Sequence, residues 1–377
     1  MSRTGDGPRH FVAALSRRGF SLGLAGLALP WPGAASAAPA VDVVVGTGAS
    51  APPGVPVYPT LTAFLASDLG RAAHPVTVRM AAGEHWGQVV IERPNLRLVG
   101  DGREATFLRA GAYAGAVAPD GKPYGTFRSA VIDVRAPGFH AQDLTFENAF
   151  DAWSEMGKAG GLKADKGGSQ QAIALSLGGG ADRSTILRCA IRSHQDTLFC
   201  ASGRALFVDC RISGSYDFIF GGATARFERS EIVSRPRVEP VEGYIAAPST
   251  KLDRAAGLVF DGCSLIAEPG VPDRSVFLGR PWRSSVRTGS GSVPDKQSVG
   301  MAAYLRCAMG PHIAPTGWTR MWFGTPQQWF EPEDARFMEF ANRGPGAAGP
   351  RRGATLTAEQ AGALSRGTMF ADWPPDI

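Results

Sequence analysis

Three short segments in the middle of the chain place polar side chains among the apolar residues that are typical of strands. They read Gln171-Ala172-Ile173-Ala174-Leu175, Gln195-Asp196-Thr197-Leu198 and Asp217-Phe218-Ile219-Phe220-Gly221. Two carboxylates held close together in partly apolar surroundings cannot both ionise easily, so one pKa rises while a nearby cation can keep the other carboxylate charged. Asp196 and Asp217 would then supply an acid and a nucleophile.

Neutral donors and one cation accompany the two aspartates. Gln171 and Gln195 carry amide N–H groups, which stabilise a developing oxyanion without adding charge that would quench the acid. Further along, the segment 278–282 contains Arg280, a guanidinium partner for a carboxylate, and Trp282, an aromatic plate for a sugar ring. A single Asp or Gln in a repetitive β-structure usually has a structural role, so this chemistry requires one repeated element that positions all of them.

Such an element is visible as a six-residue pattern with four of the five cysteines at its fourth position. Its copies are Ile186 to Ile191, Phe207 to Ile212, Phe227 to Ile232, Phe260 to Leu265 and Tyr304 to Met309. The first intervals are 21 and 20 residues, and a period of this size indicates a solenoid. An earlier stretch, Phe139 to Leu144, fits the pattern if Gln142 takes the fourth position.

Strands rich in Val, Ile and Phe between glycines favour a right-handed parallel β-helix, since the Leu/Asn ladder of a leucine-rich horseshoe is missing. Equivalent residues of adjacent coils then lie about 4.8 Å apart. Asp196 and Asp217, 21 residues apart, would stack on one face. We therefore predict an all-β, single-stranded right-handed parallel β-helix. A short helix within Pro59 to Ser67 would cap its N-terminal end, coils would begin near Pro75 to Met80, and a C-terminal segment from Gly310 would pack along the coils.

The shared cysteine position has two interpretations. It is either a ladder of small apolar residues in the core or the site of a disulfide between Cys189 and Cys210, whose adjacent-coil spacing a disulfide accepts. The five cysteines form no C-x-x-C motif or Cys/His cluster, which argues against a zinc site.

The first 37 residues resemble a twin-arginine export signal. Arg17 and Arg18 precede a short apolar run, Phe20 to Leu29, and Ala35-Ser36-Ala37 has the small residues of a cleavage site. We expect residues 1–37 to be a signal peptide cleaved near Ala37, residues 38–377 to form one domain, and the product to be periplasmic or secreted. Its 35 basic and 33 acidic side chains are no nucleic-acid signature, and no later run is apolar enough to anchor it in a membrane.

Together these motifs resemble the bacterial pectin methylesterase (pectinesterase) family across most of the predicted domain. The motifs are the three segments above, Leu278-Gly279-Arg280-Pro281-Trp282, and the supporting stretches 89–102, 247–250 and 340–347. The resemblance implies a β-helix that hydrolyses the methyl esters of pectin, or homogalacturonan, without a metal or other cofactor. We expect a monomer with no nucleic-acid or membrane partner.

The resemblance also implies roles for individual residues. Asp217 would be the nucleophile, and Asp196 the acid that protonates departing methanol and then the base that activates water. Gln171 and Gln195 would form the oxyanion site, and Arg280 would hold Asp217 ionised.

Five residues would bind substrate, and three of them depart from the family pattern. They are Trp282, Phe220, Tyr216, Phe199 and His194. His194 and Phe199 stand where tyrosines are usual, and Tyr216 where a small or β-branched residue is usual. His194 would either titrate beside the cleft or serve in packing and hydrogen bonding.

Three other functions compete with this one. A β-helix could cleave polygalacturonate itself, because a retaining glycosidase also needs two carboxylates about 5 Å apart. The Gly-His-Gly motif and clustered aspartates of polygalacturonases and lyases are missing, however. An esterase or thioesterase-like relative acting on another acyl substrate, and a non-catalytic glycan-binding β-helix, remain the alternatives.

Overall fold

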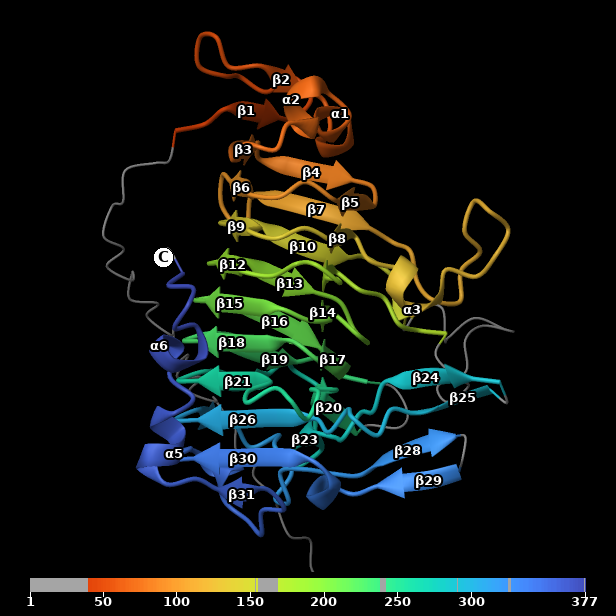
Figure 1. The fold of residues 1–377 in the computed structure, drawn as a ribbon, viewed down its shortest axis with the longest axis vertical. Helices are drawn as coiled ribbons and strands as arrows, with labels where there is room; N and C mark the ends of the chain where they lie inside the picture. The colour runs from red at the N-terminus through yellow and green to blue at the C-terminus, as the bar shows by residue number, and fades with distance from the viewer. Residues whose placement is uncertain are drawn as a thin grey trace, which may run out of the picture. The chain divides into compact units, whose positions relative to one another are not determined.

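The computed structural model describes residues 40–152, 154, 169–237, 242–289, 291–324, 327–375 and 377. The expected signal peptide lies outside these residues. Residues 40–377 form one compact unit. Within it the chain winds through three parallel sheets, one strand of each per coil, as Figure 1 shows. The predicted parallel β-helix is confirmed.

The first sheet is the longest of the three and runs through the whole stack. Its strands, in spatial order, are β2 (Val57–Tyr58), β1 (Val43–Val45), β3 (Val76–Met80), β6 (Leu96–Gly100), β9 (His140–Gln142), β12 (Ser184–Leu187), β15 (Arg204–Val208), β18 (Thr224–Glu228), β21 (Leu258–Asp261), β26 (Met301–Leu305), β30 (Arg336–Phe340) and β31 (Ala354–Thr355). The sheet thus extends by β1 and β2 beyond β3, where the sequence predicted that the coils begin.

The second and third sheets follow the first in each coil. The second sheet contains β27 (Ala308–Met309), β22 (Ser264–Ala267), β19 (Glu231–Ser234), β16 (Arg211–Gly214), β13 (Ala190–Arg192), β10 (Thr145–Asn148), β7 (Thr106–Ala110) and β4 (Gly83–Trp86). The third sheet contains β23 (Val276–Gly279), β20 (Gly243–Pro248), β17 (Tyr216–Gly221), β14 (Leu198–Cys200), β11 (Leu175–Leu177), β8 (Ile132–Val134) and β5 (Val89–Ile91).

Short helices and two hairpins complete the described elements. The helices are α1 (Leu61–Leu65), α2 (Asp68–Arg71), α3 (Gly125–Arg128), α5 (Ala358–Gly362) and α6 (Arg366–Met369), with single 3₁₀ turns at Pro332–Asp334 and Pro345–Ala347. The antiparallel hairpins are β24 (Ser285–Thr288) with β25 (Gly291–Pro294), and β28 (Met321–Gly324) with β29 (Gln327–Phe330). Among the described residues, no helix is long and apolar enough to cross a membrane.

In-register stacking places like residues over one another in the core. The first residue of the six-residue pattern forms an aromatic column, because Phe207 pairs with Phe227, Phe227 with Phe260, and Phe260 with Tyr304. Successive ring centroids are 4.7, 4.7 and 4.4 Å apart, and the rings are nearly parallel. The column fills the core at the spacing of the strands.

The chain turns from the first sheet into the second at a single residue with left-handed backbone conformation in each of these coils. The third position of the pattern has φ between 47° and 64° in Asp143, Arg188, Asp209, Arg229, Gly262 and Arg306. One left-handed residue turns the chain sharply, and Asp tolerates this conformation better than β-branched residues do. The pattern therefore marks a corner of the coil.

The earliest copy of the pattern was aligned incorrectly from the sequence. Ile186 pairs with Ala141 and Leu187 with Gln142, so Leu144, two residues after Gln142, takes the cysteine position. The alignment expected from the sequence and the observed one both place apolar residues at the two ends of the copy. Only the pairing of the strands shows which alignment is right. Leu144 is fully buried, as the position requires.

The cysteine position is a core ladder that contains four of the five cysteines, and all five are buried and unpaired with one another. The thiols of Cys210, Cys263 and Cys307 each donate to a carbonyl of the preceding coil, at 3.4 to 3.5 Å. Burial raises the pKa of Cys210 to about 12, so the thiol stays protonated. The structure thus agrees with the first of the two interpretations.

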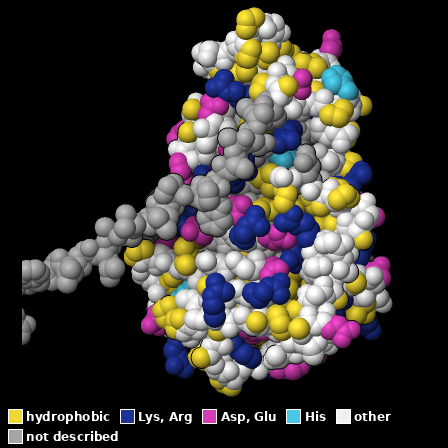
Figure 2. All heavy atoms as spheres, turned by 90° about the vertical axis from the view of Figure 1, so that its left-hand side faces the viewer, with side chains coloured by type: hydrophobic (Ala, Val, Ile, Leu, Met, Phe, Trp, Pro, Cys, Tyr) yellow, Lys and Arg dark blue, Asp and Glu magenta, His cyan; other side chains and the backbone are white. Residues whose placement is uncertain are grey.

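Ion pairs tie the corner residues of adjacent coils together. Arg188 binds Asp143 through two bonds of 2.7 Å, and Arg229 binds Asp209 through two of 3.0 Å. Basic and acidic side chains lie side by side on this face in Figure 2. The arginines are about half exposed, so each pair contributes little to stability.

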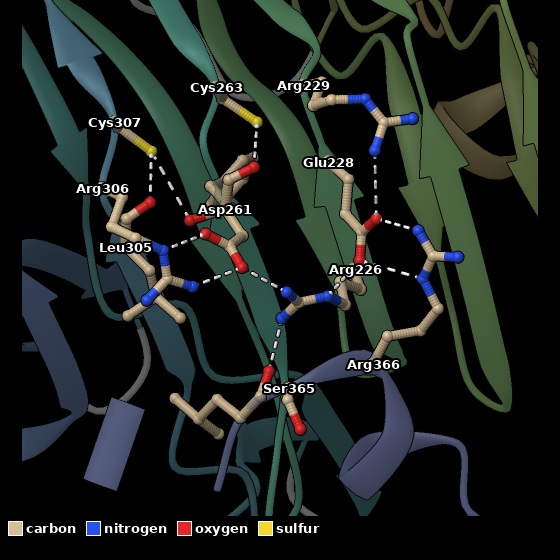
Figure 3. Close-up of polar contacts among 12 residues, drawn as sticks. Arg226, Glu228, Arg229, Asp261, Cys263, Leu305, Arg306, Cys307, Ser365 and Arg366 are labelled. Atoms are coloured by element: carbon tan, nitrogen blue, oxygen red, sulfur yellow. Dashed lines mark hydrogen bonds and ion pairs between the residues drawn. The ribbon is translucent and has the colours of Figure 1, made fainter. Parts of the chain in front are cut away.

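One cluster on the outer side of the first sheet is buried instead, and it holds the C-terminal segment (Figure 3). Arg226, only 4% exposed, lies between the carboxylates of Glu228 and Asp261 and also donates to the carbonyl of Leu364. Arg366 of α6 binds the same Glu228. Residues more than 100 positions apart are thereby joined at β18.

We predict that Arg226→Ala lowers the free energy of unfolding by about 2–4 kcal/mol. This is somewhat below the usual cost of breaking a buried ion pair, because Glu228 and Asp261 keep Arg366 and Arg306. Urea denaturation followed by circular dichroism measures the loss. Arg229→Ala, which removes a half-exposed guanidinium from the same face, should cost about 1 kcal/mol or less. Equal losses in the two variants would contradict a special role for the buried cluster.

Candidate active site

The polar residues picked out by their spacing do meet on one face, at the strands of the third sheet. Gln171 forms a parallel bridge to Gln195, and Gln195 one to Tyr216. Leu198, three residues after Gln195, pairs with Ile219, three after Tyr216. Because both pairings differ by 21 residues, Asp196 and Asp217 occupy equivalent positions in adjacent coils.

Both aspartates lie at irregular points of the backbone. Their φ angles are 61° for Asp196 and 48° for Asp217, in the left-handed region that Asp adopts more readily than most residues. At Asp217 the pairing of β17 with β20 also shifts register between Tyr216 and Ile219. Bulges of this kind redirect side chains next to active sites. Here both carboxylates lie at residues with left-handed backbone conformation, and the register shift accompanies Asp217.

Arg280 pairs with Asp217 through two hydrogen bonds. Its Nε and Nη2 donate to the two carboxylate oxygens over 2.8 and 2.5 Å, and the side chains are only 13% and 10% exposed. Burial lowers the pKa of Arg280, but the charge and hydrogen bonds of Asp217 outweigh burial and raise it. This bidentate contact fixes the relative orientation of the two side chains and favours the charged form of Arg280.

Asp196 has the opposite electrostatic environment. Its residue is 8% exposed, and no ion pair to it occurs among the described residues. Burial, and then the negative charge of Asp217, raise the pKa of Asp196 well above its ordinary value, against a smaller opposing effect of Arg280. The two stacked carboxylates therefore differ in environment: burial favours the protonated form of Asp196, whereas Asp217 is paired to a cation.

Two tyrosines hold the guanidinium of Arg280. Its carbon lies 4.4 Å from the ring centroid of Tyr216 and 4.3 Å from that of Tyr244. These contacts attract a cation to the ring faces and restrict the plane of the guanidinium. The sequence did not suggest Tyr244, because it follows Tyr216 by 28 residues instead of one coil period.

An aromatic surface borders the aspartates. Phe199 stacks on Phe220 with centroids 4.7 Å apart, Phe127 adjoins Phe199 at 4.9 Å, and Trp282 meets the edge of Phe220 at 5.7 Å. A hollow beside Phe199 and Trp282 continues toward Ser249, Lys251 and Arg254, and these residues line it. Aromatic faces next to polar groups suit the binding of sugar rings.

The remaining predicted residues lie close by. Gln171 and Gln195 are half-buried, and within the described part of the chain the Gln171 Oε1 accepts no hydrogen bond. His194 is 8% exposed, and burial, reinforced by Arg235, lowers its pKa to about 3. His194 is therefore neutral at ordinary pH, which favours packing over titration. Across the described residues, no group of three or more His, Cys, Asp or Glu side chains could hold a metal ion.

A parallel β-helix that presents two stacked carboxylates, one of them paired to a buried guanidinium, defines a class, the β-helix proteins with a two-carboxylate site. Comparison with known proteins specifies the family. The pectinesterase family model matches residues 51–360. The chain therefore belongs to the pectinesterase family, and it is a carboxylic ester hydrolase.

Individual relatives agree with this assignment. Pectinesterase A of Dickeya chrysanthemi is 34% identical over 312 residues, which span 80% of this chain and 84% of that protein. Pectinesterase 1 of Solanum lycopersicum is 32% identical over 302 residues, spanning 78% of this chain and 48% of that protein. The structure of pectin methylesterase PemA from Erwinia chrysanthemi has a TM-score of 0.81 at 33% identity and covers 90% of this chain and 100% of that one.

We predict that Asp196→Asn stabilises the protein at pH 7 and that the gain shrinks toward pH 4. The folded state holds the proton of Asp196 more tightly than the unfolded state, so wild-type stability falls as pH rises from the unfolded pKa toward the raised folded one. Asn carries no charge and also accepts the left-handed conformation. Denaturation at both pH values, compared with wild type, measures the difference.

Asp101→Asn is the matched control with the opposite sign. The hydrogen bond from Arg79 lowers the pKa of Asp101, so its contribution to stability is present at pH 7 and is lost as pH falls. Asp101→Asn should therefore destabilise the protein more at pH 7 than in acid. A pH-independent effect of Asp196→Asn would contradict the proposed protonation of Asp196.

Proposed function

We propose that the protein removes methyl esters from pectin, leaving free galacturonate carboxylates and methanol. The observation that carries the proposal is the unequal pair: Asp217 is bound by Arg280, whereas Asp196 is buried and its pKa is raised. Family membership supports the choice of ester. A similar structure, with a TM-score of 0.81 and 32% identity over 90% of this chain and all of that one, is a pectin methylesterase in complex with a hexasaccharide.

In the first step, the Asp217 carboxylate attacks the carbonyl carbon of the methyl ester. The carbonyl oxygen becomes an oxyanion, and the side-chain amides of Gln171 and Gln195 donate hydrogen bonds to it. Asp196 gives its proton to the departing methoxy oxygen, so methanol leaves and an acyl group remains on Asp217. The neutral amides lower the barrier without adding a charge near Asp196.

In the second step, Asp196 is ionised and takes a proton from water. The resulting hydroxide attacks the acyl carbon, the bond to Asp217 breaks, and Asp217 returns to its ion pair with Arg280. The same burial that raised the pKa of Asp196 makes its carboxylate a stronger base in this step. Each residue thus ends in its starting state.

The aromatic surface would position the sugar chain for this reaction. Trp282 and Phe220 offer ring faces and edges beside Asp217, and Phe199 and Tyr216 extend the apolar border. His194 would contribute a neutral polar group. The unusual identities of residues 194, 199 and 216 leave an ester of another acyl substrate as the alternative function.

Methanol release from highly methylated pectin tests the function. We predict methanol from wild type and a loss in rate on the order of 10³-fold or more in Asp217→Asn, because an amide cannot act as the nucleophile. Asp209→Asn, at a left-handed corner position of the first sheet, is the matched control and should keep the wild-type rate. No methanol from wild type would refute the function, and equal rates in both variants would refute the role of Asp217.

We also propose that the protein is exported and acts as a monomer outside the cytoplasm. The support for export is the pair Arg17 and Arg18 followed by an apolar run and Ala35-Ser36-Ala37. In a bacterial host, the exported protein should begin at or near Ala38, and changing both arginines to lysine should stop export. Sequencing of the N-terminus measures this, and an intact N-terminus on exported protein would contradict the proposal.

A further inference from the structure

An exposed tryptophan lies far from the two aspartates, near the N-terminal end of the coils. Trp86 is the last residue of β4 in the second sheet, and it is 61% exposed. Strand pairing leads from Trp86 through β7, β10 and β13 to Ser213 in β16, the strand that precedes β17. Four strand spacings, about 19 Å, therefore separate Trp86 from the coil of Asp217. Figure 1 shows β4 at that end of the stack.

Neighbouring side chains hold the indole of Trp86 in one orientation. Its Nε1 donates to one carboxylate oxygen of Glu84 over 2.8 Å. The other oxygen of Glu84 accepts from Arg109, whose Nε donates to Glu147 over 2.8 Å. Beside the indole, Gly87 has a φ of 130°, and a Cβ at that position would meet no atom within 4 Å. The ring is thus fixed at its nitrogen edge and open to solvent elsewhere.

Two hollows border Trp86 on the surface. One, with a volume of about 440 Å³, is also lined by Thr47, Thr62 and His85, and the other includes Tyr124. Thr47 and Thr62 are exposed, so their hydroxyls can donate and accept hydrogen bonds. His85 Nε2 donates to a backbone carbonyl over 2.8 Å, which leaves Nδ1 as an acceptor. An open aromatic face beside hydroxyls and a ring nitrogen, in a concave surface, suits a sugar ring.

The charges beside Trp86 favour an uncharged ligand. Arg109 lies between Glu84 and Glu147, so these three side chains together carry one negative charge. The nearby pair of Arg79 with Asp101, which also accepts from the backbone at the rim of the hollow, is neutral. A sugar that carries a carboxylate would meet this excess negative charge, and an uncharged sugar would not.

We propose that the hollows at Trp86 bind an uncharged stretch of polysaccharide, at a site separate from the two aspartates. One face of a pyranose ring stacks on the indole, and its hydroxyls form hydrogen bonds with Thr47, Thr62 and His85. Because Glu84 fixes the indole before the ligand arrives, little conformational freedom is lost on binding. This site goes beyond the proposed function and does not depend on it.

Nitrogen–proton NMR spectra of the indole groups test the proposal. The Trp86 signal is the one missing from Trp86→Phe, and the Trp282 signal, assigned in the same way with Trp282→Phe, reports on the aromatic surface at the aspartates. Asp217→Asn is titrated with galactohexaose, fully methyl-esterified hexagalacturonate or unesterified hexagalacturonate. The Trp86 signal should shift and saturate with at least one of the two uncharged probes, and which probe acts identifies the source of the sugar. Unesterified hexagalacturonate should bind this site at least about tenfold more weakly.

Calorimetry with the active probe measures the contribution of the indole. Trp86→Ala should weaken binding at least about tenfold, as expected for a central aromatic contact. Trp329→Ala, which removes a 47% exposed indole from the hairpin of β28 and β29, is the matched control and should bind like its parent. Glu84→Gln, which removes the excess negative charge, should improve the binding of unesterified hexagalacturonate.

Three results would overturn the proposal. They are a Trp86 signal that neither uncharged probe moves, a shift of the Trp282 signal alone, and equal binding of uncharged and unesterified chains at Trp86. Unchanged affinity of Trp86→Ala for the probe that shifts the Trp86 signal would also contradict stacking on the indole.

Discussion

The spacing of one strand between adjacent coils is the constraint on which the rest of this structure depends. Parallel pairing in register puts each residue over its equivalent in the next coil, about 4.8 Å away. In the core, this produces the column of Phe207, Phe227, Phe260 and Tyr304. On the outer face of the third sheet, the same spacing brings two carboxylates together. They would repel one another if both were ionised.

Different environments of the two aspartates relieve that repulsion. Arg280 binds one carboxylate, and burial favours the protonated form of the other, which opposes two adjacent negative charges. Tyr216 and Tyr244 hold Arg280 in place, and the guanidinium of Arg237 also lies over the ring of Tyr216. The proposed nucleophile and the proposed acid therefore depend on one small arrangement of two aromatic rings and the guanidinium of Arg280.

Sequence reasoning succeeded where a feature repeats at the coil period. The parallel β-helix, the buried cysteine position and the stacking of Asp196 over Asp217 all follow from intervals of about 20 residues. It failed where only strand pairing fixes the alignment. Gln142 was expected at the cysteine position, but that position is taken by Leu144, two residues later. It also missed contacts between residues without a common interval, such as Arg226 with Leu364, and Arg237 with Tyr216.

The central claim is that the two stacked aspartates differ in protonation while the enzyme is at rest. Infrared difference spectroscopy of the carboxylic acid band at pH 7, on wild type and on Asp196→Asn and Asp217→Asn, tests it most directly. We expect a protonated-carboxyl band in wild type that disappears in Asp196→Asn and survives in Asp217→Asn. Loss of the band in Asp217→Asn with its survival in Asp196→Asn would reverse the two roles and contradict this account.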